Sequence, residues 1–372
     1  MSDYWSDLVR WLVPYVPGEQ PRDRKFVKLN TNENPYPPSP LVIEAIKKAA
    51  GENLRLYPDP ACTELREAVA ARYGVKIEQV FAGNGSDEIL AFAFAAFFGR
   101  AALCEIDSDS VEDDILFPDV TYSFYPVFTD LWGLAYRMIP LKDDFSIDIA
   151  PYLDISDGVV LPNPNAPTGM AVSLEDLRKI AEAAERNKRV LIVDEAYIAF
   201  ADKEGVATAL PLIAEFPNLL VIRTLSKEAS LAGLRAAFAV GGEELIEGLC
   251  RVRDSFNSYT LDRLALAGAA AAVNDSSYYD AINRKVIATR GRVSAGLQAM
   301  GFRVLPSQAN FIFAAPPSGK NGQEFFTALR ERGFLVRHFN KPRIADFLRI
   351  SIGTNEDMNA FLEACGEIIR KT

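Results

Sequence analysis

Between residues 78 and 255, short apolar runs alternate with longer segments of helical periodicity, and few folds accommodate this pattern. The apolar runs read QVFAG, AALCEI, ILFPDVT, GVVLP, RVLIVDEA, NLLVIRT and AAFAVG. The helical segments between them include SDEILAFAFAAFF and SLEDLRKIAEAAERNK. Such alternation is typical of α/β domains with a mostly parallel sheet. We therefore predict an α/β fold built on a large sheet of this kind.

One connection in this region differs from the others. The link between NLLVIRT and RAAFAVG is shorter than the dozen or so residues that a parallel crossover needs. We therefore expect RAAFAVG to run antiparallel to the strand that precedes it.

The flanking regions have a different texture and suggest three parts. Residues 1–36 are rich in Pro, Asn and charge and predict an extended N-terminal arm. Residues 37–255 form the predicted large domain, although helical segment 37–50 could pack with the smaller one. From residue 256 to 372, long helical stretches precede short strands such as NFIFAA and FLRISIG, which predicts a smaller α+β domain.

Composition excludes several classes of partner and site. The net charge of −10 argues against nucleic acids and anionic membranes as main partners. The four cysteines form no CxxC pair, and there is one histidine, so neither a zinc site nor another metal site is expected. The N-terminus lacks the features of a secretory signal, and we expect a protein of the reducing cytoplasm.

A glycine-rich turn follows the first apolar run, in FAGNGSDEIL (81–90). Ser86 and Asp87 open the next helix, whose backbone N–H groups could bind a phosphate, or these residues could simply cap that helix. A dinucleotide site is a weaker alternative, because Glu105 ends the next run but the third glycine of that motif is absent.

Two further polar groups follow apolar runs. Asp194 ends VLIVD and could hold a proton on a ring nitrogen or cap the next element. Lys227 follows NLLVIRTLS and could form a Schiff base, or it could be a solvated loop lysine. Arg235 lies close behind it and would lower the pKa of a buried lysine. In open α/β sheets, ligands bind beyond the carboxyl ends of the strands. The glycine-rich turn, Asp194 and Lys227 together therefore predict a site for pyridoxal 5′-phosphate.

The chain resembles the fold-type I pyridoxal-phosphate-dependent aminotransferases of class I/II, most closely the histidinol-phosphate aminotransferase family. The resemblance runs over nearly the whole length. It rests on LNTNENPYPPSP, RLYPDP, GNGSDEI, DVTYSFY, NPNAPTG, VDEAYIAF, RTLSK, LAGLR, SQANF and LRISIGT.

This resemblance implies roles for residues around the cofactor. Lys227 would form the Schiff base, Asp194 would pair with the pyridine nitrogen, and Tyr197 would donate to the 3′-oxygen. Tyr122 would stack on the ring. The phosphate would be bound by Ser86, Asp87, Thr224, Ser226 and Arg235, and by Tyr57 of the neighbouring subunit, which makes a homodimer necessary.

The resemblance also implies substrate contacts. Arg349 would bind a carboxylate, and Arg337 would contact the distal group or phosphate of the substrate. Tyr15 and the asparagines of the arm, Asn32 and Asn34, would close over the site.

Two positions depart from the family pattern. Ala166 stands where the family usually has an asparagine that bonds the 3′-oxygen of the cofactor, and Asn165 would reach the cofactor only if the backbone shifted. Glu228 follows the lysine and is expected to add negative charge near the phosphate site.

The function implied by the resemblance is transfer of the amino group of histidinol phosphate to 2-oxoglutarate, with ping-pong kinetics. A related aromatic amino acid aminotransferase and a threonine-phosphate decarboxylase remain alternatives. A non-catalytic protein of the same fold that binds or regulates is a third, and a nicotinamide-dependent dehydrogenase is a distant fourth.

Overall fold

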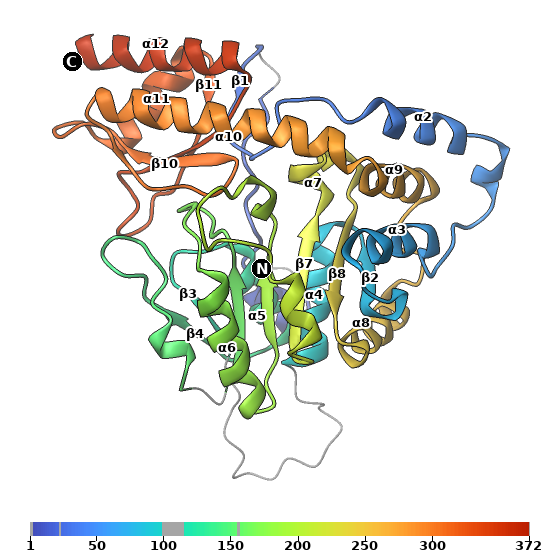
Figure 1. Ribbon diagram of the computed structural model, residues 1–372. Coiled ribbons are helices and arrows are strands. Elements are labelled where there is room, and N and C mark those ends of the chain that lie inside the picture. Colours follow the sequence, from blue (N-terminus) through green and yellow to red (C-terminus); the bar gives the residue numbers. More distant parts are fainter. Residues whose placement is uncertain (1–2, 22–23, 99–114, 155–156, 372) are drawn as a thin grey trace.

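The structure is a computed structural model and describes residues 3–21, 24–98, 115–154 and 157–371. The chain forms a large α/β body and a smaller α+β body, the latter at the top of Figure 1 with helices α10 to α12. Run AALCEI and Glu105 lie outside the described residues. Among the described residues, no helix combines the length and apolar character needed to cross a membrane.

The large body is built on a sheet that has seven strands among the described residues, in the order β2-β8-β7-β6-β5-β3-β4. Its strands are β2 (Val80–Gly83), β3 (Ile115–Pro118), β4 (Tyr136–Ile139), β5 (Gly158–Pro162), β6 (Leu191–Asp194), β7 (Leu219–Thr224) and β8 (Ala237–Gly241). Strand β8 pairs antiparallel with both β7 and β2, whereas the other pairs are parallel. The expected antiparallel strand and the α/β fold are thus confirmed.

Helices cover both faces of this sheet, and the side chains of the strands alternate between them. In β6, Leu191 and Val193 pack into the cluster that holds Leu177 and Ile180 of α6, while Ile192 packs into the cluster of α4 on the opposite face. All residues of β5, β6, β7 and β8 are buried. Burial on both faces explains why these strands read as unbroken apolar runs rather than as alternating ones.

Many of the α-helices follow periodic segments of the sequence, but Asp7–Trp11 is helical within the arm that was expected to be extended. The α-helices are α1 (Asp7–Trp11), α2 (Pro40–Ala49), α3 (Thr63–Tyr73), α4 (Gly85–Phe97), α5 (Phe124–Trp132), α6 (Leu174–Arg186), α7 (Leu225–Glu228), α8 (Glu243–Phe256), α9 (Arg263–Asn274), α10 (Ser276–Ala299), α11 (Gly322–Glu331) and α12 (Asn355–Lys371). Short 3-10 helices span Glu52–Arg55, Ile77–Gln79, Ala150–Tyr152, Ile198–Phe200, Leu210–Ala214 and Ala232–Leu234.

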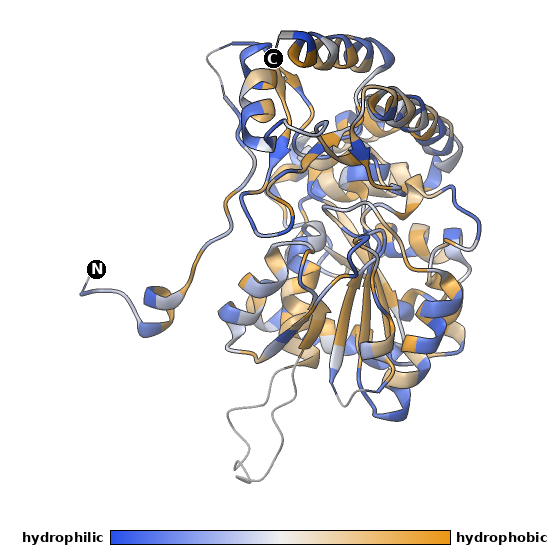
Figure 2. Ribbon diagram, turned by 90° about the vertical axis from the view of Figure 1, so that its left-hand side faces the viewer, coloured by the Kyte–Doolittle hydropathy of each residue, from blue (hydrophilic) through white to orange (hydrophobic). Residues whose placement is uncertain are grey.

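The smaller body contains two sheets. Strands β12 (Arg337–His338), β13 (Leu348–Ser351), β10 (Phe311–Ala315) and β9 (Arg303–Val304) pair antiparallel in that order. Strand β1 (Val27–Lys28) comes from the N-terminal region and pairs parallel with β11 (Phe334–Leu335). The segment with α1 extends away from both bodies (Figure 2).

Two contacts bear on how the chain divides. Helix α9 packs against α2 and α3, and its apolar residues belong to the same hydrophobic cluster as the large sheet. Leu29, just after β1, belongs to the cluster of the smaller body. The division at residues 36 and 255 stays a prediction. Both contacts cross these boundaries, since α9 packs with the large body and Leu29 packs with the smaller one.

Candidate active site

A cavity opens where β6 and β7 end and α4 begins, between the two bodies. Most of the side chains singled out from the sequence line it. Its lining includes Tyr15, Asn32, Ser86, Asp87, Tyr122, Ala166, Asp194, Tyr197, Thr224, Ser226, Lys227, Arg235, Arg337 and Arg349. Residues distant in sequence meet here because the parallel strands end at the same edge of the sheet.

Lys227 projects into the cavity from α7, the short helix that follows β7. The Thr224 hydroxyl accepts a hydrogen bond from Ser226 N at 3.2 Å and so caps α7. The Lys227 ammonium Nζ donates to the Thr31 carbonyl at 3.0 Å. Burial, with a further contribution from Arg349, lowers the pKa of Lys227 to about 8. An amine with this pKa has a neutral population near physiological pH, as nucleophilic chemistry requires.

Asp194 ends β6 and is buried. Tyr125 donates from its hydroxyl to Asp194 Oδ2 at 2.9 Å, and Ala196 N donates to Oδ1 at 3.2 Å. Burial raises the pKa of Asp194 to about 6, and these two donors oppose that rise. The carboxylate therefore needs a cationic partner in the cavity to be fully stable as an anion. Sequence reasoning missed Tyr125, although it lies in the DVTYSFY motif three residues after Tyr122.

The N-terminus of α4 forms a cup with α7 and Arg235. Gly85 has a φ of 79°, and a Cβ added there would lie 2.5 Å from Arg235 Nη2, so glycine is required for this approach. Arg235 Nη2 and the Tyr122 hydroxyl both donate to Asp87, at 3.2 and 2.7 Å. The Ser226 hydroxyl is buried and finds no partner among the described residues. A buried donor without a partner, at a helix N-terminus beside an arginine, suits a bound phosphate.

The far wall of the cavity carries Tyr197, Ala166 and Arg349. Asn32 Nδ2 donates to the Tyr197 hydroxyl at 2.9 Å, which leaves the hydroxyl proton of Tyr197 free to point elsewhere. Arg349 Nη2 donates to the Asn30 carbonyl at 3.0 Å, and its buried Nε finds no partner among the described residues. Burial lowers the pKa of Arg349.

The N-terminal segment contributes Tyr15, Pro17 and Gly18 to the lining of the cavity. The ring of Tyr15 stacks on Phe124 with centroids 4.3 Å apart. Arg337 donates to the carbonyls of Val16 and Pro17 at 3.0 and 3.3 Å. Both Tyr15 and Arg337 line the cavity.

Three predicted site residues do not line this cavity. Asn165 is buried and points away, donating to the Val120 carbonyl at 2.9 Å. Asn34 Nδ2 donates to the backbone carbonyl of Lys227 at 3.2 Å. Tyr57 is 78% exposed and stacks on Tyr259, with centroids 4.6 Å apart.

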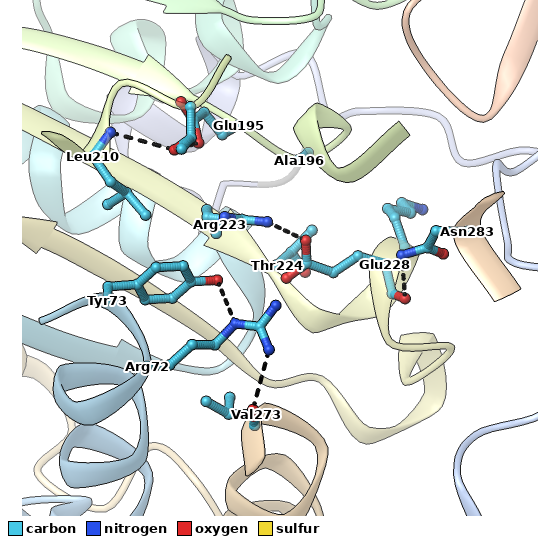
Figure 3. Close-up of polar contacts among 12 residues, drawn as sticks. Arg72, Tyr73, Glu195, Ala196, Leu210, Arg223, Thr224, Glu228, Val273 and Asn283 are labelled. Carbon is cyan, nitrogen blue, oxygen red and sulfur yellow. Dashed lines mark hydrogen bonds and ion pairs between the residues drawn. The ribbon is translucent and has the colours of Figure 1, made fainter. Parts of the chain in front are cut away.

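The expectation for Glu228 was wrong. Its carboxylate forms an ion pair with the buried Arg223 (Figure 3), and Glu228 is not part of the cavity lining. The cation of Arg223 offsets the charge of Glu228, so Glu228 adds no free negative charge beside the cup.

This fold and site define a class. A lysine just after β7, a buried carboxylate at the end of the neighbouring strand β6 and a cup at the N-terminus of α4 beside an arginine are the arrangement of fold-type I pyridoxal-phosphate-dependent enzymes. The chain matches the description "Aminotransferase class I and II" over residues 24–365 and belongs to that family.

Known proteins similar to this chain agree with that assignment. The histidinol-phosphate aminotransferase of Clostridium acetobutylicum is 50% identical over 369 residues, which cover 99% of this chain and 100% of that protein. That of Aromatoleum aromaticum is 50% identical over 374 residues and covers both chains fully. The crystal structure of the Sinorhizobium meliloti histidinol-phosphate aminotransferase in complex with pyridoxal-5′-phosphate has a TM-score of 0.85. It is 24% identical, covers 100% of this chain and 99% of its own, and shows the shared fold.

Proposed function

We propose that this chain uses pyridoxal 5′-phosphate to transfer the amino group of histidinol phosphate to 2-oxoglutarate, a step of histidine biosynthesis in the cytoplasm. The products would be imidazole acetol phosphate and glutamate. The observation that carries the proposal is one cavity that joins Lys227, Asp194 and Arg349, in a chain half identical to relatives named for this reaction.

The cofactor fits the residues that are present. Ser226 and Arg235 would hold its phosphate with the backbone N–H groups of Ser86 and Asp87, where the Ser226 hydroxyl otherwise has no partner among the described residues. Thr224 would join them. Asp194 would face the pyridine nitrogen, and Tyr122 would stack on the ring.

Tyr197 would supply the donor to the 3′-oxygen of the cofactor. The Asn32 amide donates to the Tyr197 oxygen, so the phenolic proton is not used in that bond and could be donated to the cofactor. Ala166 lines the cavity but cannot donate, and the Asn165 amide is occupied by the Val120 carbonyl.

Bound pyridoxal phosphate supplies an electron-withdrawing ring that stabilises negative charge on the carbon bearing the amino group of the donor. Lys227 would hold the cofactor at its aldehyde carbon. When an amino donor takes its place, the freed Lys227 amine would remove the proton from the Cα of the donor and deliver it to the former aldehyde carbon of the cofactor. With a pKa of about 8, roughly a tenth of this amine is neutral at pH 7.

Arg349 would bind the carboxylate of glutamate and 2-oxoglutarate through its planar guanidinium. Histidinol phosphate has no carboxylate, so its phosphate would bind Arg349 together with Arg337. The pocket supports this, because both arginines line it. Tyr15 and Asn34 would help to close the site, Tyr15 directly and Asn34 through the backbone of Lys227.

The working unit would be a homodimer. Tyr57 lies on the surface and stacks on Tyr259, and Leu54 and Leu56, close to it in the chain, are exposed as well. Exposed apolar side chains that lie together indicate an interaction surface. Pairing there would let Tyr57 of one subunit reach the phosphate in the other.

The experiment is a panel of amino donors added, without an acceptor, to the cofactor-loaded protein. Histidinol phosphate should convert the cofactor to its amine form, seen by absorbance, with the highest kcat/KM and no release of CO₂. Faster conversion by phenylalanine would assign an aromatic aminotransferase instead, and CO₂ from threonine phosphate would assign a decarboxylase. If no donor reacted, the result would favour a non-catalytic protein of the same fold that binds the cofactor.

A further inference from the structure

A buried ion pair lies next to Lys227 in the chain, between two residues that do not line the cavity. Arg223, the penultimate residue of β7, pairs with Glu228, the last residue of α7 (Figure 3). The two side chains are only 7% and 14% exposed. Lys227 precedes Glu228 in the chain, so the ion pair fixes the backbone from which the lysine projects.

Helix α7 depends on such contacts because it has only four residues. An isolated helix of this length is not stable in water, since nucleation costs more than one turn of hydrogen bonds returns. The Thr224 hydroxyl satisfies one N–H at its start. The other contacts that hold this helix in place must come from residues outside it.

Two asparagines hold the peptide carbonyls around the lysine. Asn34 Nδ2 donates to the carbonyl of Lys227, and Asn283 Nδ2, from α10, donates to the carbonyl of Glu228, both at 3.2 Å. Asn34 Nδ2 also donates to Asn283 Oδ1 at 3.1 Å. Segments from the N-terminal region and from α10 are therefore joined on α7.

Arg223 forms its ion pair with Glu228 and not with Glu195, the second carboxylate of this region. Glu195 lies in the same region, but Thr208 Oγ1 and Ala209 N donate to its two oxygens at 2.6 and 2.5 Å. The Arg223 guanidinium also lies over the Tyr73 ring, 5.4 Å from its centroid. Packed between a ring and a carboxylate, the guanidinium has little freedom to move away from Glu228.

We propose that Arg223 and Glu228, together with Asn34 and Asn283, are positioning residues that direct the Lys227 amine into the cavity. This inference rests on the proposed role of Lys227. The lysine stem has four rotatable bonds, so the place of its amine depends on how firmly its backbone is held. A displacement of the reacting group by about 1 Å can cost about a hundredfold in rate.

The test measures how fast Lys227 captures pyridoxal phosphate in the full-length chain. Cofactor-free protein is mixed with pyridoxal phosphate, quenched with borohydride at set times, and the peptide that contains Lys227 is quantified by mass spectrometry. The melting temperature of each variant is measured in parallel. Asp202→Asn is the matched control, because Asp202 pairs with the buried Arg290 away from α7.

Glu228→Gln should slow capture by at least about tenfold, whereas Asp202→Asn should leave the rate unchanged. The double variant Arg223→Met/Glu228→Met replaces the pair by apolar side chains, which often restores stability lost when one partner is removed. We expect this double variant to recover the melting temperature but not the capture rate.

The two readouts separate positioning from a purely structural role. Capture at the wild-type rate by Glu228→Gln, or recovery of rate together with stability in the double variant, would overturn the inference. If wild-type protein captured no pyridoxal phosphate at Lys227, the proposed function would fail, and the positioning role would fail with it.

Discussion

Replacing Lys227 by methionine should stabilise the cofactor-free protein. The pKa of Lys227 falls from its ordinary 10.5 to about 8, chiefly because burial removes the ammonium group from water. Since one pKa unit corresponds to about 1.4 kcal/mol, the folded chain disfavours the charged lysine by about 3 kcal/mol at pH 7. Methionine keeps an unbranched apolar stem and carries no charge, so Lys227→Met removes this cost.

The sign of the pH dependence follows from the two pKa values. At pH 7 and below, the lysine is mostly protonated in both the folded and the unfolded chain, and nearly the full cost is present. Between pH 8 and 10.5, the folded chain binds fewer protons than the unfolded chain, so the stability of the wild type rises with pH. The advantage of the variant should therefore shrink to less than about 1 kcal/mol at pH 10.

Urea unfolding of cofactor-free protein at pH 7 and pH 10, at equal protein concentration, measures this difference. Lys203→Met is the matched control, because Lys203 is exposed, and it should change stability at neither pH. A Lys227→Met protein no more stable than the wild type at pH 7 would refute the reasoning. So would an advantage that is the same at both pH values.

Three further predictions concern the cofactor site. Ala166→Asn adds a donor to the cavity and should move the absorbance titration of the bound cofactor to lower pH; superimposable titration curves would contradict this. Tyr125→Phe removes a donor from Asp194, which raises the pKa of that carboxyl further, so the acidic limb of the pH profile of kcat/KM should move to higher pH. If the acidic limb did not move, the ionisation of Asp194 would not control the reaction. Ser226→Ala should weaken cofactor binding by about 10- to 150-fold in equilibrium dialysis, because a hydrogen bond to a charged group contributes about 1.5–3 kcal/mol, while the stability of the cofactor-free protein does not fall. Unchanged affinity would place the phosphate elsewhere.

The architecture was largely predictable because its strands are buried on both faces. Continuous apolar runs correspond to β5 to β8, and the short link before β8 indicated its antiparallel direction. Strand β4 was not predicted. It lies at the sheet edge, where only Ile139 of its four residues is buried, and its sequence YRMI is interrupted by Arg137, so it carries no clear apolar run. The pairing of β1 with β11 joins residues about 300 apart, and such a contact leaves no local signal in the sequence.

The candidate site was predictable in its location and less so in its side-chain directions. Parallel strands place Asp194 and Lys227 at one edge of the sheet, so their meeting follows from the fold. The direction of Asn34 depends on Asn283, and that of Glu228 depends on Arg223. These partners lie on other elements, and only the packed structure brings them together.

The most direct test of the account is the identity of the residue that binds the cofactor. Protein loaded with pyridoxal phosphate is reduced with borohydride, digested and analysed by mass spectrometry, with Lys227→Met as the control. The account predicts one modified peptide, the one that contains Lys227, and none in the control. Modification at another lysine, or equal modification of the control, would contradict it.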